Sequence, residues 1–139
     1  MQHLFVPYQE AYELKQLGFD EPCLGFSSSI HPEKIDLDNN CFLSFYKLTN
    51  KNIDSDVFIT RPTYQQVFDW FREKHSLYSY IEPVIVEHAV SPIKFDYVIL
   101  ELDIENEIIF DTLPFHSNQE AQLACLQKLI EIVKTKINI

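Results

Sequence analysis

The stretch PTYQQVFDWFREKHSL, residues 62–77, lies near the middle of the 139-residue chain and decides much of the fold. Pro62 suits the first position of a helix, because its missing N–H would have no partner there. Apolar side chains then follow at the i, i+3, i+4 and i+7 spacing of one helix face, namely Tyr64, Val67, Phe68 and Phe71. This spacing predicts a helix that runs to about His75, with the aromatic stripe in the core.

Trp70 is the one aromatic residue of this helix that the core stripe does not explain. It falls on the flank of the helix, beside Lys74. Tryptophan is enriched at the energetic centres of protein interfaces. We therefore expect Trp70 to be exposed and to belong, with Lys74, to a partner-binding surface.

Two further helices are predicted near the ends of the chain. The first begins near Pro7 and Tyr8 and stops at Gly18, because glycine readily adopts the left-handed conformation that ends a helix. The last begins with a capping box, in which Ser117 is followed by Glu120.

The apolar positions of the last helix cover more of its circumference than packing on one sheet requires. The surplus predicts burial on two sides, against the sheet and against either another helix or a second subunit. The residues expected at a homodimer seam are Leu126, Ile130, Val133 and Ile137.

Strand-like segments lie between these helices. They cover residues 23–28, 41–48, 80–88 and 95–104, and a further strand is expected from Glu107. Pro83 indicates that its segment is an edge strand or contains a bulge. The helix starts are spaced 56 and 54 residues apart, which fits either a degenerate αββ repeat or the capping chemistry that all helix starts share.

These elements predict one α+β domain over residues 1–139, in the order αββαββ(β)α. We expect an antiparallel sheet of four to five strands, with the three helices packed mainly on one face. An apolar fraction of 46% and an aromatic fraction of 14% also indicate a folded globule.

Composition also bears on location. No apolar run is long enough to span a membrane, and no signal peptide is recognisable. The cysteines are widely spaced, odd in number and without a CxxC motif, which indicates reduced thiols and a cytoplasmic location. They are Cys23, Cys41 and Cys125.

The net charge of −10 comes from 21 acidic and 11 basic residues. Proteins bind the phosphate backbone through Lys and Arg, so direct binding of nucleic acid is not expected. The acidity serves either solubility or, alternatively, the imitation of DNA by rows of carboxylates.

No motif predicts a cofactor, a metal or a catalytic residue. Two glycines in the whole chain exclude a glycine-rich phosphate loop. DLDNN at 36–40 begins like a calcium loop, but Cys41 and Lys47 stand where such a loop has Gly and Glu. The histidines lack zinc-ligand spacing relative to one another and to the cysteines. Those considered as ligands are His31, His75, His88 and His116.

An acidic set is the densest charge feature of the chain. Paired carboxylates can perform acid–base or metal-assisted hydrolysis when they are held a few ångströms apart. Here they alternate along a strand and its turn, which is typical of a solvated sheet face or a protected edge. The set consists of Glu101, Asp103, Glu105, Glu107 and Asp111.

Three segments resemble a family of short proteins encoded in bacteriophages, prophages and other mobile elements of gut bacteria. They are FVPYQEAYELKQLGFDEPCLGF (5–26), PTYQQVFDWFREKHSLYSYIEP (62–83) and EAQLACLQKLIEIVK (120–134). The family has no established activity, so the resemblance implies no catalytic residue. This chain departs from it at Asp69, where the family tends to place Arg, and in a longer loop that brings Phe115 near an expected partner surface.

The sequence therefore favours a small non-enzymatic accessory protein of a mobile element that acts by contact with an unidentified protein partner. The expected partner-binding residues are Trp70, Lys74 and Phe115. One alternative is an acidic decoy that inhibits a host DNA-binding protein. A second is a hydrolase with a site that gathers Glu101 or Asp103 with a histidine.

Overall fold

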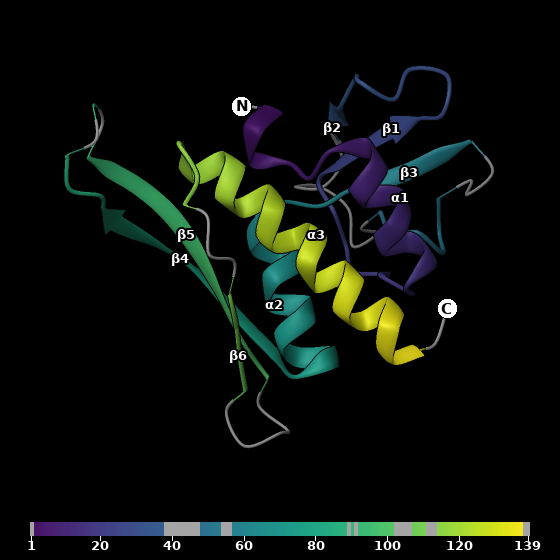
Figure 1. Cartoon of the computed structure of the whole chain (residues 1–139). Helices are drawn as coiled ribbons and strands as arrows, with labels where there is room; N and C mark the ends of the chain where they lie inside the picture. Colours follow the sequence, from purple (N-terminus) through teal and green to yellow (C-terminus); the bar gives the residue numbers. More distant parts are fainter. Residues whose placement is uncertain are drawn as a thin grey trace. The chain divides into compact units, whose positions relative to one another are not determined.

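The computed structural model describes residues 2–37, 48–53, 57–88, 90, 92–101, 107–110 and 114–137, and of 107–110 it describes the backbone. Contacts divide the chain into two compact units, Met1–Val67 and Phe68–Ile139 (Figure 1). The boundary falls within helix α2 (Tyr64–His75). The expectation of a single domain stays a prediction.

The first unit contains helix α1 (Tyr8–Gln16) and a three-stranded antiparallel sheet in the order β2-β1-β3. Its strands are β1 (Gly25–Ser28), β2 (Asp36–Leu37) and β3 (Phe58–Arg61), and a short 3-10 helix, η1 (Gln2–Leu4), precedes α1. Helix α1 packs next to β3. Its buried side chains Ala11 and Leu14 contribute to the core of this unit.

Helix α1 ends as predicted. Gly18 has a φ of 92°, in the left-handed region. The N–H of Phe19 donates to Leu14 O at 2.9 Å, and the N–H of Gly18 donates to Lys15 O at 3.1 Å. This pair of hydrogen bonds is the Schellman motif, which satisfies carbonyl groups that the helix end would otherwise leave unpaired.

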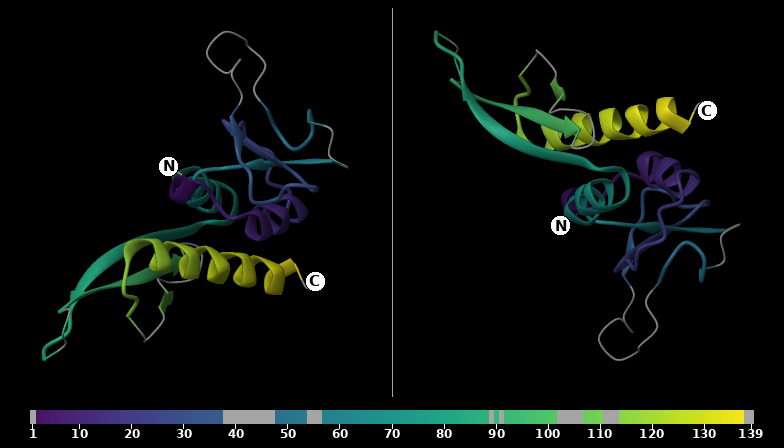
Figure 2. Two further views of the ribbon diagram at one scale, coloured as in Figure 1. Left: turned by 90° about the horizontal axis from the view of Figure 1, so that it is seen from above. Right: turned by 90° about the horizontal axis from the view of Figure 1, so that it is seen from below.

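The second unit is built on a long antiparallel hairpin of β4 (Leu77–Ile85) and β5 (Ile93–Glu101), to which β6 (Glu107–Phe110) adds a third strand. Helix α3 (Asn118–Ile137) packs along β5 and β4. The views of Figure 2 show the hairpin tip reaching beyond the N-terminal end of α3. Strand β4 forms one edge of the sheet order β4-β5-β6, so Pro83 lies on an edge strand as predicted.

The start of α3 confirms the capping prediction. The N–H of Glu120 donates to Ser117 Oγ at 3.2 Å, and Glu120 Oε2 accepts the N–H of His116 at 3.1 Å. The Glu120 side chain thus reaches back to the residue before the helix cap. The buried side chains of α3 are Ala121, Cys125, Leu126, Leu129, Ile130 and Val133.

The α+β class, the three helices and the rough order of elements are confirmed. Within the described residues, however, the strands form two three-stranded sheets rather than one larger sheet. Strands β2 and β3 are short, with two and four residues, and both belong to the sheet of the first unit. The strand expected at 41–48 and the end of the calcium-like stretch fall on 38–47, outside the described residues.

The order of the described elements repeats along the chain, with an α-helix followed by three described strands in each half. The order of strands within the sheets does not repeat. The central strand is the first of its group in β2-β1-β3 and the second in β4-β5-β6. This difference favours shared capping chemistry over a true αββ repeat.

Candidate functional site

The first unit buries an arginine in a polar network. Arg61, at the end of β3, donates from Nε to Val6 O at 2.7 Å. Its Nη1 donates to Ser27 Oγ at 2.8 Å and to Pro32 O at 2.9 Å. The guanidinium therefore joins the N-terminal segment, strand β1 and the turn after β1. The network holds three chain segments together and positions no open reactive group.

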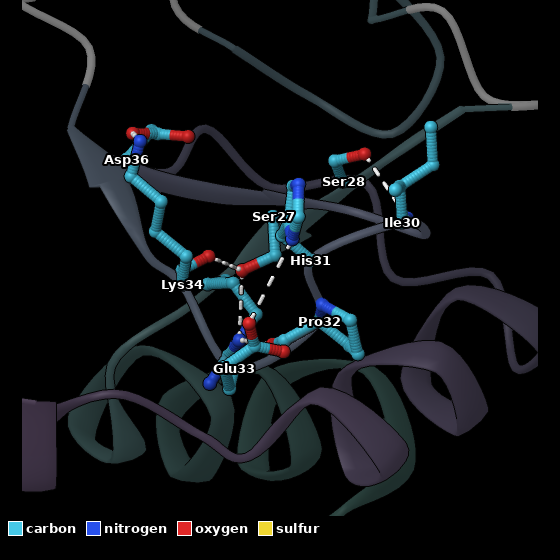
Figure 3. Close-up of polar contacts among 9 residues, drawn as sticks. Ser27, Ser28, Ile30, His31, Pro32, Glu33, Lys34 and Asp36 are labelled. Atoms are coloured by element: carbon cyan, nitrogen blue, oxygen red, sulfur yellow. Dashed lines mark hydrogen bonds and ion pairs between the residues drawn. The ribbon is translucent and has the colours of Figure 1, made fainter.

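The turn between β1 and β2 supports this arginine (Figure 3). Ser27 Oγ donates to Lys34 O at 2.6 Å while it accepts from Arg61. Ser28 Oγ accepts the N–H of Ile30 at 3.1 Å. The ion pairs of this turn lie at its exposed surface, where each contributes little to stability. They join His31 to Glu33 and Lys34 to Asp36.

Titratable groups surround Arg61. Burial lowers the pKa of Arg61, and the nearby Glu10 carboxylate partly offsets this. Burial also raises the pKa of Tyr64 to about 12, with Glu10 acting in the same direction. Arginine stays charged despite such shifts, so the first unit buries the positive charge of Arg61 with the buried Glu10 close enough to act on it.

Strand β5 of the second unit buries the face that carries Glu101. Tyr97, Ile99 and Glu101 are buried, whereas Val98 and Leu100 are half-buried. The prediction that Glu101 belongs to a solvated face is therefore wrong. Helix α3 covers this buried face of β5, which carries Tyr97, Ile99 and Glu101. The rest of the acidic set lies outside the described side chains.

The buried carboxylate of Glu101 has a charged partner on α3. Glu101 is 4% exposed, and its Oε1 forms an ion pair with Lys136 Nζ. The Lys136 side chain remains 46% exposed, in the last turn of the helix. Sequence reasoning missed this pair, although a lysine one residue before the end of an otherwise apolar helix row was a usable signal.

His75, the last residue of α2, lies in the electrostatic field of this pair. Burial and the charge of Lys136 both lower the pKa of His75. Its Nε2 is buried and has no hydrogen-bond partner within the part of the chain that the structure describes. The ring packs edge-on against Trp70, with 4.7 Å between centroids. His75, Glu101 and Lys136 thus bring one titratable and two charged groups from three elements into one region of the second unit.

The opposite face of the β4–β5 hairpin carries two exposed tyrosines. Tyr78 is 40% exposed and Tyr80 is 41% exposed, two residues apart on β4. The residues facing them across the ladder are Leu100 and Val98. The guanidinium of Arg72 lies 5.6 Å from the centre of the Tyr78 ring, a cation–π contact. We call Tyr78, Tyr80, Val98 and Leu100 the tyrosine face.

Two carboxylates continue the tyrosine face toward the hairpin tip. Glu82 on β4 and Asp96 on β5 are direct cross-strand partners. Like charges directly opposite each other destabilise a strand pair. Neither carboxylate forms an ion pair with a residue that the structure describes, and the nearby Lys94 amine instead binds His116 Nδ1 at 2.7 Å. The face therefore combines aromatic surface with two carboxylates that form no ion pair with the described residues, although Asp96 Oδ1 accepts the N–H of Tyr97 at 2.8 Å.

The structure corrects the prediction for Trp70. Its side chain is 5% exposed and packs edge-on against Phe71, with 5.0 Å between ring centroids, and against His75. A helical wheel gives the direction in which a side chain points but not what it packs against, and the flank of α2 that carries Trp70 is covered by other parts of the chain. Trp70 is a core residue, so the exposed anchor expected from the sequence is wrong.

The other residues expected at a partner surface have different positions. Lys74 is exposed near the end of α2. Phe115 is half-buried and stacks on Tyr97, with 6.2 Å between ring centroids, and its backbone pairs with Phe95. Since Tyr97 belongs to the face that α3 covers, Phe115 lies away from the tyrosine face.

The side chains expected at a homodimer seam are mostly buried within the single chain. Leu126, Ile130 and Val133 are buried, and Ile137 alone among the four is exposed, at 49%. These three side chains are thus covered within the single chain. A second subunit is not needed to cover these three residues.

The described cysteines are free and unreactive in this fold. Burial raises the pKa of Cys23 and of Cys125 to about 12, and each is close to a hydroxyl group that acts in the opposite direction. A thiol with such a pKa is protonated at neutral pH and is a poor nucleophile. Among the described residues, no three His, Cys, Asp or Glu side chains gather as metal ligands.

Comparisons of the chain with protein-family models, with curated proteins and with solved structures find no significant match. In the described ranges, no helix has the length and apolar character needed to cross a membrane.

Proposed function

We propose that this chain is a small non-enzymatic accessory protein of a bacteriophage or other mobile element, and that it acts by binding a protein partner through the tyrosine face. The resemblance of three sequence segments to mobile-element proteins supports the biological setting. The tyrosine face replaces the surface expected around Trp70. The observation that carries the proposal is the pair Tyr78 and Tyr80, both about two-fifths exposed on a face opposite to α3.

Tyrosine is suited to such a surface. The tyrosine ring supplies a large contact area at a low cost in conformational entropy, and its hydroxyl can form hydrogen bonds at the solvated rim of an interface. The Arg72 guanidinium already lies on the Tyr78 ring and is itself paired with Asp69 at 2.7 Å. A side chain held before binding loses less entropy when a partner docks.

The charge of this face defines the chemistry of the partner. Glu82 and Asp96 face each other beside Tyr80 without a cation from the described chain. The protein as a whole carries a net charge of −10. The partner is therefore a protein that presents an apolar side chain to the tyrosines and a Lys or Arg to the two carboxylates, which also steers association. The free thiols of Cys23 and Cys125 support a reducing, cytoplasmic setting for this contact.

The test is a tagged pull-down from host lysate at low and high salt, followed by affinity measurement with the purified partner. The variant Tyr78→Ser/Tyr80→Ser removes both rings. Tyr12→Ser is the matched control, since Tyr12 is 44% exposed on α1. We expect the double variant to bind the partner with a Kd roughly 30-fold higher than that of the wild type, which is equivalent to about 2 kcal/mol of binding free energy. The control should bind as the wild type does.

The salt series separates this proposal from the acidic decoy. A partner that stays bound at high salt and is lost from the double variant supports the tyrosine face. A partner that is lost at high salt and retained by the double variant supports a charge-driven decoy instead. If nothing is retained from the host at either salt concentration, the proposed contact is contradicted for that host.

A further inference from the structure

Strand β4 is an edge strand, and its described neighbour in the sheet is β5. One hydrogen bond shows which of its backbone groups face away from β5. Val86 continues the register of the Ile85–Ile93 pair, and its N–H donates to Pro92 O at 2.7 Å. In an antiparallel pair, residues that exchange hydrogen bonds alternate with residues that do not. Every second residue of β4, counted back from Val86, therefore bonds to β5, and the residues between them direct N–H and C=O outward.

Strand β5 confirms this assignment independently. Phe95 lies opposite Pro83, but its N–H donates to Phe115 O at 2.9 Å and its C=O accepts the N–H of Phe115 at 2.6 Å. Both backbone groups of Phe95 are thus occupied by Phe115 and do not bond to Pro83. Pro83 therefore stands at an outward-facing position, where the pairing with β5 needs no N–H.

The outward backbone groups of β4 form an open edge. No described segment forms a backbone hydrogen bond with the outward groups of Ser79 or Ile81. An unpaired edge of this kind is a template for another strand. The edge that can pair runs from Leu77, where β4 begins, to Pro83, which accepts a hydrogen bond but cannot donate one. Tyr80 is the central residue of this segment.

We propose that the edge of β4 binds the edge of β4 in a second copy of this chain, antiparallel and with the two Tyr80 residues opposite each other. In this register Ser79 exchanges backbone hydrogen bonds with Ile81 of the second copy, and the two-fold axis repeats the exchange. Two sheets then become one continuous sheet. The tyrosine face stays open and is doubled, so the dimer adds to the function proposed above and does not depend on it.

Charge complementarity favours a second copy as the occupant of this edge. The register places Glu82 opposite Tyr78 of the second copy, and the Arg72 guanidinium lies 5.6 Å from the centre of the Tyr78 ring. Glu82 forms no ion pair with a described residue of its own chain. Arginine has five N–H donors, so Arg72 can bind this carboxylate while it stays paired with Asp69. Each copy therefore supplies the cation that the other lacks.

The centre of the interface is aromatic. The two Tyr80 residues form a pair without mutual hydrogen bonds, the arrangement in which cross-strand side chains are closest, and aromatic pairs at such positions stabilise a sheet. The net charge of −10 on each copy opposes association. Salt screens this repulsion, so the dimer is expected to be favoured at high salt.

Disulfide trapping in the full chain tests the register. Cys41→Ser is introduced into every variant, and Cys23 and Cys125 are buried. Tyr80→Cys places two thiols across the axis, where the Cα atoms lie about 4.5 Å apart, a separation that a disulfide can bridge. We expect a covalent dimer on mild oxidation, seen by electrophoresis without reducing agent.

Tyr78→Cys is the matched control for the trapping experiment. Tyr78 is 40% exposed and Tyr80 is 41% exposed on the same face of β4. In the proposed register, however, the two Tyr78 residues lie roughly 13 Å apart along the strands. We expect at least tenfold less covalent dimer than from Tyr80→Cys. Equal trapping of the two variants, or no trapping of Tyr80→Cys, would overturn the proposal.

Sedimentation velocity of the purified chain provides the second arm. The wild-type sedimentation coefficient should rise with concentration, and at a given concentration it should be higher at high salt. Glu82→Arg and Arg72→Glu should each weaken self-association several-fold, and an equal mixture of the two should restore it, because each variant then carries the charge that complements the other. A wild type that sediments as one copy throughout, or a mixture that behaves as its separate components do, would contradict the dimer. Neither result bears on the pull-down that tests the proposed function.

Discussion

The two units of this molecule bury a charged group in different ways. In the first unit, Arg61 is surrounded by hydrogen-bond acceptors from three chain segments, namely Val6 O, Ser27 Oγ and Pro32 O. In the second unit, Glu101 depends on one lysine at a helix end. The first arrangement is distributed and fixed, whereas the second is concentrated in a single contact that solvent can reach. A buried charge can therefore be held by several chain segments at once or by a single ion pair.

The cores of the two units also differ in the polar residues that they bury. The buried polar residues of the first unit are Glu10, Ser27, Asn50, Thr60 and Arg61, whereas Glu101 is the buried charged residue described in the second. Asn50 shows the pattern, since its amide donates to Phe19 O at 2.8 Å and its Oδ1 accepts from the N–H of Thr60 at 3.2 Å. We expect the first unit to be sensitive to lost hydrogen bonds and the second to lost apolar packing.

The largest effect is expected from Trp70→Ala, which tests the apolar core of the second unit. Removing this ring should lower the free energy of unfolding by about 3–5 kcal/mol, because it leaves a large cavity. Urea denaturation followed by circular dichroism measures the change. A loss under about 1 kcal/mol would restore Trp70 as an exposed surface residue.

A somewhat smaller effect is expected from Arg61→Met, which tests the polar core of the first unit. The substitution keeps much of the side-chain volume but leaves three acceptors without their donor. We therefore expect the free energy of unfolding to fall by about 2–4 kcal/mol. Arg72→Met is the matched control, because Arg72 is exposed and its ion pair with Asp69 contributes less than about 1 kcal/mol. Equal losses in the two variants would contradict the cross-linking role of Arg61.

The smallest and most selective effect concerns the buried thiols, which report on the two units separately. Cys23 lies in the first unit and Cys125 in the second, and burial raises the pKa of each to about 12. Alkylation should therefore proceed only when the surrounding unit opens. We expect Arg61→Met to accelerate the labelling of Cys23 roughly tenfold more than that of Cys125. Trp70→Ala should have the opposite preference and accelerate the labelling of Cys125 roughly tenfold more than that of Cys23.

Peptide-level mass spectrometry resolves the two labelling rates. Wild-type protein is the reference, and denatured protein gives the maximal rate for each thiol. If each variant accelerates the labelling of both thiols equally, the two units open together. The expectation that the two units respond to different substitutions would then be wrong.

Local patterns predicted the helices of this protein well. The capping box at Ser117 and Glu120 and the left-handed Gly18 both act within a few residues, so they are visible in the sequence. The placement of Pro83 on an edge strand also follows from a local property, its missing N–H. The prediction of one sheet of four to five strands was wrong, because the number of sheets depends on which distant strands pair.

The candidate sites were harder to predict for the same reason. Both faces of β5 carry apolar residues, with Val98 and Leu100 on one and Tyr97 and Ile99 on the other. Alternation alone cannot decide which face is buried in such a strand. The docking of α3 decides it, and this placement buries Glu101 and leaves the tyrosines of β4 exposed.

Local sequence patterns thus predicted where helices begin and end, which helix stripes are apolar and that the class is α+β, since these properties depend on neighbours within a turn or two. The burial of Trp70, the contact of Glu101 with Lys136 and the outward position of Tyr78 and Tyr80 are visible only in the folded chain. Those outcomes depend on contacts between residues far apart in the chain, and no local spacing encodes them.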